Sequence, residues 1–194
     1  MPHFFRPYVK GESDEEKERY CEKAANHTYL LTYFIVTVCW GWNVLKGNPF
    51  LPASVGGPVD GSISNIVLDT MFVKYDEPQL DYLFWQQGFH LGNLIEILFM
   101  SERKDDFTEM FLHHVASNSL YFGGIYGNVF PFGVITGYFH DLSDLPLHFC
   151  RILMTLKYDI AIVGGVFLLP CWFWTRLCLL PQFIYTCLDT LKYP

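Results

Sequence analysis

The stretch from Phe111 to Asp144, FLHHVASNSLYFGGIYGNVFPFGVITGYFHDLSD, decides how this chain folds. It has no Asp, Glu, Lys or Arg before Asp141, yet it carries a histidine pair near its start and HDLSD at its end. Ionisable side chains inside an apolar stretch of membrane-spanning length are costly, and by default they mark a functional site. The stretch therefore predicts membrane helices whose polar side chains face the protein interior.

The composition of the 194 residues agrees with this prediction. Of these residues 51% are hydrophobic and only 17% are charged, which is too apolar for an ordinary soluble domain. The net charge of −7 argues against nucleic acid as a partner, because there is no basic surface to meet phosphates. The six cysteines show no zinc-ligand spacing and are interpreted as free thiols in apolar surroundings.

The N-terminal part of the chain differs from the rest, because acidic residues crowd the first 26 positions. The sequence Ser13-Asp14-Glu15-Glu16 has the form of a capping box, which predicts the start of a polar helix. We therefore expect a polar, helical segment over residues 1–26 and a membrane domain over residues 27–190.

Five apolar segments in the membrane domain are long enough to cross a bilayer. They are residues 27–45, 80–100, 107–126, 129–156 and 160–188. If all five segments span the membrane, nine Lys and Arg lie on the same side of it as the N-terminus and three lie on the opposite side. This excess predicts that the N-terminus lies in the cytoplasm or in the matrix of an organelle. A short amphipathic helix is expected near residues 63–71, and a charged loop at 101–106. The predicted fold is all-α, a polytopic bundle of about five transmembrane helices.

Polar residues recur at helical spacing within three of these segments. In 80–100 the predicted polar face consists of Gln86, His90 and Asn93, with Glu96 extending it. In 107–126 it consists of His114, Asn118 and Tyr121, with His113 beside it. In 129–156 it consists of His140, Asp141, Asp144 and His148. The short link between the last two segments predicts an antiparallel pair, so their polar faces should meet across a cavity.

This set of residues suits acid–base or nucleophilic chemistry. Histidine exchanges a proton near neutral pH, and Asp141 or Asp144 could fix the tautomer of His114 or His140. Two other interpretations remain open: polar groups that only satisfy one another between helices, and a metal site built from ligand-like spacing in 140–148.

Arg176 lies in the middle of the last apolar segment and requires a partner or a place in the cavity wall. Glu96 and Asp69 are the expected partners for a buried ion pair. The face with Gln86 and His90 is expected either to line the cavity or to form hydrogen bonds between helices.

Several motifs occur together in a familiar order. Residues 102–107 (ERKDDF), 110–114 (MFLHH) and 140–147 (HDLSDLPL) resemble the signature of ceramide synthases and the wider TLC-domain family. Upstream 82–87 (YLFWQQ) and downstream 173–177 (FWTRL) also resemble segments of that family. The resemblance implies a ring of transmembrane helices around a central lipid cavity. It implies catalytic roles for the matching positions, which are His113, His114, His140, Asp141 and Asp144.

The activity implied by the resemblance is transfer of a fatty acyl group from acyl-CoA to the amine of a sphingoid base. A histidine would either deprotonate the amine or first accept the acyl group. Acyl-CoA would be a co-substrate, with no bound cofactor or metal, and the endoplasmic reticulum would be the location. The remaining polar residues of the faces, together with His148 and Arg176, would line the cavity or bind substrate.

The chain departs from the family pattern at His148 and Arg151, where glutamate and lysine are usual, and it has five predicted spans where the ring needs about six. These departures favour an alternative function: a non-catalytic, lipid-binding accessory subunit of a larger membrane assembly, such as a respiratory complex of the mitochondrial inner membrane. Its partners would be membrane lipids and other membrane subunits, or further copies of the chain.

Overall fold

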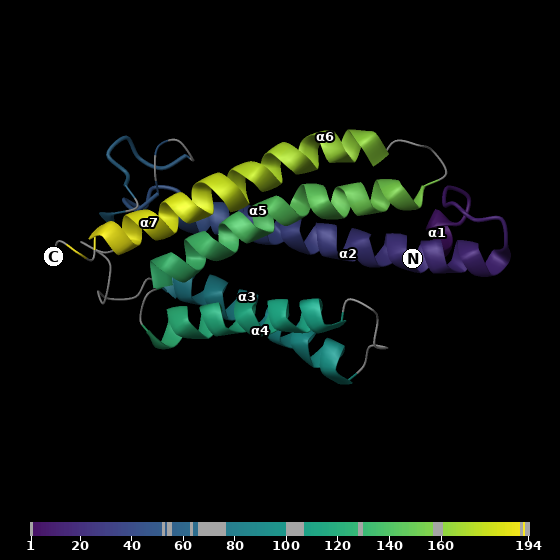
Figure 1. The fold of residues 1–194 in the computed structure, drawn as a ribbon, viewed down its shortest axis with the longest axis horizontal. Coiled ribbons are helices and arrows are strands. Elements are labelled where there is room, and N and C mark those ends of the chain that lie inside the picture. The colour runs from purple at the N-terminus through teal and green to yellow at the C-terminus, as the bar shows by residue number, and fades with distance from the viewer. Residues whose placement is uncertain are drawn as a thin grey trace. The chain divides into compact units, whose positions relative to one another are not determined.

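The computed structural model describes residues 2–51, 53, 56–62, 64–65, 77–99, 107–127, 130–156, 161–190 and 192. The elements are α1 (Pro2–Phe5), α2 (Asp14–Leu45), α3 (Glu77–Phe99), α4 (Phe107–Tyr126), α5 (Phe130–Thr155), α6 (Ala161–Trp172), the π-helical η3 (Phe173–Leu179) and α7 (Leu180–Thr190) (Figure 1). Within the described ranges, β pairing is limited to one isolated bridge between Val9 and Leu156. The all-α prediction is confirmed. The amphipathic helix expected near 63–71 and the loop at 101–106 lie largely outside the described residues.

Helix α2 begins at the predicted capping box. The Glu16 N–H donates to Ser13 Oγ at 3.1 Å, and the Glu12 N–H donates to Glu16 Oε2 at 3.0 Å. Two backbone donors at the helix start are thereby satisfied. The polar helix and the first apolar segment are one element of 32 residues, about 48 Å long. Since a bilayer core is about 30 Å thick, the polar turns before His27 can lie outside it.

The last apolar segment is helical from α6 through η3 to α7. Pro170 lies inside α6 and Pro181 follows the first residue of α7, and each removes a backbone donor from the helix. Between them the Leu180 N–H donates to the Thr175 carbonyl, five residues back, which is the hydrogen bond of a π turn. A π-helical segment therefore lies between the two prolines in a continuous helical run.

Among the described residues, two helical runs are long and apolar enough to cross a membrane: Asp14–Leu45 and Ile162–Thr186. The second run has exposed large apolar side chains along it, including Phe167, Trp172 and Phe173. Helices α3, α4 and α5 occur where spans are predicted, but they contain many polar residues. The five-span bundle and the ring around a cavity stay predictions.

The chain divides into two compact units, and each is described by itself. Unit 1 is Met1–Trp40 with Tyr138–Gln182, and unit 2 is Gly41–Gly137 with Phe183–Pro194. The HDLSD motif belongs to unit 1 and the histidine pair belongs to unit 2. The predicted facing of the two motifs across a cavity therefore stays a prediction.

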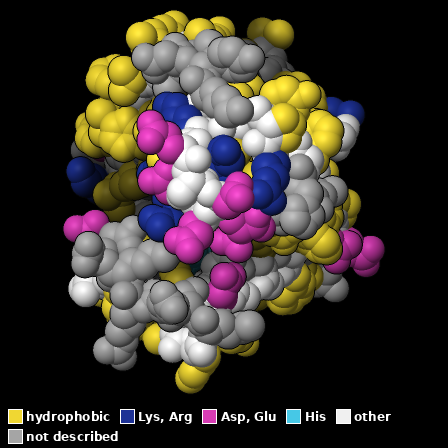
Figure 2. Space-filling view, turned by 90° about the vertical axis from the view of Figure 1, so that its right-hand side faces the viewer, with side chains coloured by type: hydrophobic (Ala, Val, Ile, Leu, Met, Phe, Trp, Pro, Cys, Tyr) yellow, Lys and Arg dark blue, Asp and Glu magenta, His cyan; other side chains and the backbone are white. Residues whose placement is uncertain are grey.

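Unit 1 is held together at its polar end by contacts of the N-terminal segment. Val9, Cys21 and Ala24 form a small buried cluster, and the Lys10 N–H donates to the Thr155 carbonyl at 2.9 Å. Figure 2 shows Lys, Arg, Asp and Glu side chains gathered on the face that carries the α1 end of this unit. This charged surface is the kind that belongs at a membrane–water interface.

Unit 2 is built on the antiparallel helices α3 and α4, which lie side by side, together with the first turns of α5 (Figure 1). Tyr82 and Leu83 of α3 are fully buried. A side chain at Gly133 would meet Leu83 at 3.0 Å, so the absence of a Cβ lets α5 approach α3 closely. Phe132 and Phe183 stack with ring centroids 4.8 Å apart.

Candidate functional site

Asn118 is the centre of a polar network between α3 and α4 in unit 2. Its Nδ2 donates to the main-chain carbonyl of His114 at 2.8 Å and to that of His90 at 3.1 Å. Its Oδ1 accepts from Gln87 Nε2 at 2.6 Å. One buried amide thus links α4 to two positions on α3 and fixes the rotation of one helix against the other.

The two histidines of the pair lie in different environments. His114 is only 7% exposed, whereas His113 is exposed, with its ring 5.4 Å from that of His114. Neighbouring positions on a helix point about 100° apart, so only one of the pair faces the interior. His114 Nδ1 is buried and has no hydrogen-bond partner among the described residues.

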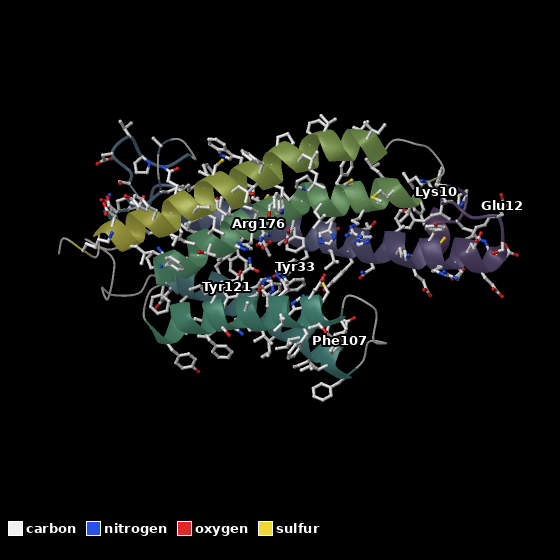
Figure 3. All side chains as sticks on the ribbon, viewed as in Figure 1. Lys10, Glu12, Tyr33, Phe107, Tyr121 and Arg176 are labelled. Atoms are coloured by element: carbon white, nitrogen blue, oxygen red, sulfur yellow. The ribbon has the colours of Figure 1, made fainter. Side chains whose placement is uncertain are left out.

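A stacked pair of rings lies beside the buried histidine. The His90 ring stacks on Tyr121 at 5.1 Å between centroids and lies 6.4 Å from the His114 ring. Tyr121 extends from α4 (Figure 3), and a Cβ at Gly137 would lie 2.8 Å from its hydroxyl. The predicted residues His90, His114, Asn118 and Tyr121 are therefore brought together.

The polar face of α3 differs in part from the prediction. Gln86 is buried, and its Nε2 donates to the Tyr82 hydroxyl one turn earlier in the same helix. Gln87, which was not predicted, reaches α4 instead. Gln87 lies three residues before His90, and this helical spacing was the signal that could have placed it on the polar face. Asn93 is half-buried and Glu96 is exposed, so the face ends before Glu96.

Arg176 has a different partner from those predicted. Its Nη2 lies 3.2 Å from Asp144 Oδ1, and its Nε donates to Ser143 Oγ at 2.9 Å. Figure 3 shows Arg176 beside α5. The prediction of Glu96 was wrong, and Asp69 lies outside the described residues. Arg176 lies within the π-helical segment, where the regular α-helical spacing of side chains does not hold.

The remaining residues of the HDLSD region have separate environments within unit 1. His148 Nδ1 lies 3.2 Å from His27 Nδ1 of α2, and its ring stacks on Phe34 at 5.2 Å. Asp141 is buried, at 1% exposed, and His140 is half-buried. His27 was not predicted, because no local spacing links α2 to α5.

The metal interpretation receives no support from this arrangement. In the part of the chain that the structure describes, no three His, Cys, Asp or Glu side chains gather as a metal site. The reason is visible in the contacts: His148 pairs with His27, and Asp144 pairs with Arg176.

A family model described as the TLC domain matches residues 23–193. The chain belongs to the TLC-domain family. No curated protein and no solved structure matches it. The family, together with the two apolar helical runs, indicates an integral membrane protein whose function involves membrane lipids.

Proposed function

We propose that this TLC-domain protein is a membrane N-acyltransferase of ceramide-synthase type. It transfers a fatty acyl group from acyl-CoA to the amine of a sphingoid base. The observation that supports the proposal most is His114, a buried histidine whose Nδ1 has no partner among the described residues. It stands on a helix that Asn118 fixes in place. A histidine that is held still but left available is suited to proton transfer.

The proposed reaction needs one general base. The amine nitrogen attacks the thioester carbonyl, a C–N bond forms, and the C–S bond breaks as the coenzyme A thiolate leaves. The proton lost by the amine passes to His114. A thiolate is a good leaving group, so the reaction does not require a strong acid. Apolar surroundings would hold the hydrocarbon chains of the acyl group and of the sphingoid base in place. The reacting amine and thioester are thereby kept close together.

The other candidate catalytic residues are assigned narrower roles. Asp144 forms an ion pair with Arg176, so we assign both to positioning η3 against α5. Asp141 is buried and, with His140, is proposed to act on the substrate or on a histidine. His113 is exposed and is proposed to contribute less than His114.

The test is ceramide formation by the full chain in lipid nanodiscs, supplied with palmitoyl-CoA and sphinganine. We expect product from the wild type and a loss of at least about a hundredfold in His114→Ala, which is the scale of a general base. His113→Ala is the matched neighbour and should retain most activity. Correctly folded wild type that makes no product would overturn the proposal, as would an active His113→Ala/His114→Ala double variant.

A second function is favoured by a specific observation in unit 1. The polar groups there satisfy one another between helices, with Asp144 on Arg176 and His148 on His27. This arrangement suits a structural protein as well as an enzyme. The protein would then be a lipid-binding accessory subunit of a larger assembly in the mitochondrial inner membrane. The acyltransferase would belong to the endoplasmic reticulum.

Gentle extraction of the protein from its native membrane distinguishes the two proposed functions. After solubilisation of native membranes in digitonin, a subunit should migrate with foreign proteins in a large complex on a native gel. Migration as a free monomer or homodimer would count against the accessory function.

A further inference from the structure

The orientation of the Gln87 amide follows from its neighbours. Asn118 Nδ2 donates to two main-chain carbonyls, which can only accept. The oxygen of Asn118 is therefore the atom that faces Gln87, and it also can only accept. Gln87 must present its NH₂ group at that contact. Its Oε1 consequently points away from Asn118, and reversing either amide would place two donors or two acceptors together.

This Oε1 is a buried acceptor without a donor. Gln87 is 7% exposed, and its Oε1 has no hydrogen-bond partner among the described residues. Unmet buried acceptors are unfavourable and rare in folded proteins, so each one requires an explanation. A ligand that donates a hydrogen bond would supply one.

His114 Nδ1 is a second atom of the same kind, and the residue is also 7% exposed. Both residues adjoin Asn118: Gln87 bonds to its side chain, and the carbonyl of His114 accepts from it. Gln87 can offer only an acceptor, and His114 offers one in the tautomer that carries its hydrogen on Nε2. Acceptors of this kind do not suit a phosphate or a carboxylate. They suit a group with two hydrogens to donate.

We infer that Gln87 Oε1 and His114 Nδ1 form a two-point site for a neutral primary amine on a long-chain lipid. One N–H of the amine donates to Gln87 and the other to His114, which leaves the lone pair free. Applied to the reaction, this inference rests on the proposed function: the lone pair attacks the acyl carbon, the C–S bond breaks, and the proton on the His114 side is transferred. The other N–H stays on Gln87 and becomes the N–H of the product amide.

The experiment compares sphinganine with N-methyl-sphinganine, which as a neutral amine has a single N–H. The wild type should prefer the primary amine. Gln87→Met should lower kcat/KM for sphinganine about tenfold, the effect of one lost hydrogen bond, with little change for the N-methyl base. The KM for palmitoyl-CoA should not change. Gln79→Met is the control, because Gln79 is another buried glutamine of the same helix.

The ratio of kcat/KM for sphinganine to kcat/KM for N-methyl-sphinganine distinguishes a role of Gln87 in binding the amine from a purely structural role. Loss of the Gln87–Asn118 bond alone would reduce turnover of both bases equally, and an unchanged ratio would overturn the inference even if the enzyme is active. Direct binding of the two bases to the full chain in nanodiscs separates the inference from the proposed function. If no ceramide forms but Gln87→Met still weakens sphinganine binding selectively, the amine site stands and the acyltransferase fails. If binding shows no such selectivity, the site fails.

Discussion

At the scale of single residues, Asn118 does more to position the candidate site than either histidine of the pair. Its side chain forms three hydrogen bonds, two of which join α4 to α3 and one of which stays within α4. Histidine chemistry depends on position, and the position of His114 depends on this amide. The polar cluster that the sequence indicates is therefore organised by a residue with no acid–base chemistry of its own.

Asn118→Leu should lower both stability and activity. The variant removes three hydrogen bonds, each with a net contribution of about 1 kcal/mol, and leaves the Gln87 amide without its acceptor. Thermal unfolding in detergent, followed by intrinsic fluorescence, should show a lower Tm. Ser119→Ala is the neighbouring control, because its exposed hydroxyl bonds only to the Val115 carbonyl of its own helix. Equal Tm values for the two variants would contradict the assigned role.

The Arg176–Asp144 pair gives a second prediction at this scale. The two side chains are 19% and 25% exposed, so removing one leaves the other charge poorly solvated. Arg176→Met and Asp144→Leu should each destabilise the protein by about 3 kcal/mol. The double variant should lose less than the sum, since neither charge is then left alone. Additive losses in chemical denaturation would show that the two residues are not coupled.

At the scale of elements, helix ends and interruptions set the direction of the key side chains. The capping box starts α2 at Asp14, and the π turn between two prolines directs Arg176 toward Asp144. Both features come from local hydrogen bonding, and Arg176 in the π turn contacts a residue of α5 that is far away in the chain.

The capping box predicts a pH dependence for the start of α2. The N–H groups of Glu12 and Ser13 hold the pKa of the Glu16 carboxyl below its ordinary value, because they donate to the charged form. A depressed pKa in the folded state stabilises the helix start above the unfolded pKa, and the effect is lost as pH falls through the folded value. Hydrogen-exchange protection of the first turn should therefore drop in acid. In Glu16→Gln, protection should not depend on pH in this range; a parallel drop would contradict the assignment.

At the scale of the whole molecule, membrane topology is the property that most constrains function. Helix α2 has its polar turns before His27 and its apolar part after it, so the residues that flank the apolar part should lie on opposite sides of the bilayer. The charge count predicts that the N-terminal side lies in the cytoplasm or matrix.

Thiol labelling in sealed vesicles tests this topology. In a background without native cysteines, Glu12→Cys should react with an impermeant maleimide from the cytoplasmic or matrix face, and Lys46→Cys from the opposite face. Both positions lie outside the apolar part of α2. Labelling of both from one face would show that α2 does not span the membrane.

The sequence alone determined the helices. Segment 107–126 is α4 without change, and segment 129–156 differs from α5 by one residue at each end. Apolar length, capping residues and prolines are local properties, so they can be interpreted without knowing what lies nearby. Helical periodicity likewise gave the polar face of α4, where His114, Asn118 and Tyr121 are all buried, but it gave that of α3 only in part.

Only the tertiary structure decided which polar residues meet. Gln87 rather than Gln86 reaches Asn118, Arg176 pairs with Asp144, and His148 pairs with His27. These partners are 31, 32 and 121 residues apart in the chain. Each pairing depends on how far one helix is rotated against another, and a change of one residue in position turns a side chain by about 100°. That rotation is set by packing between helices, which no local pattern contains.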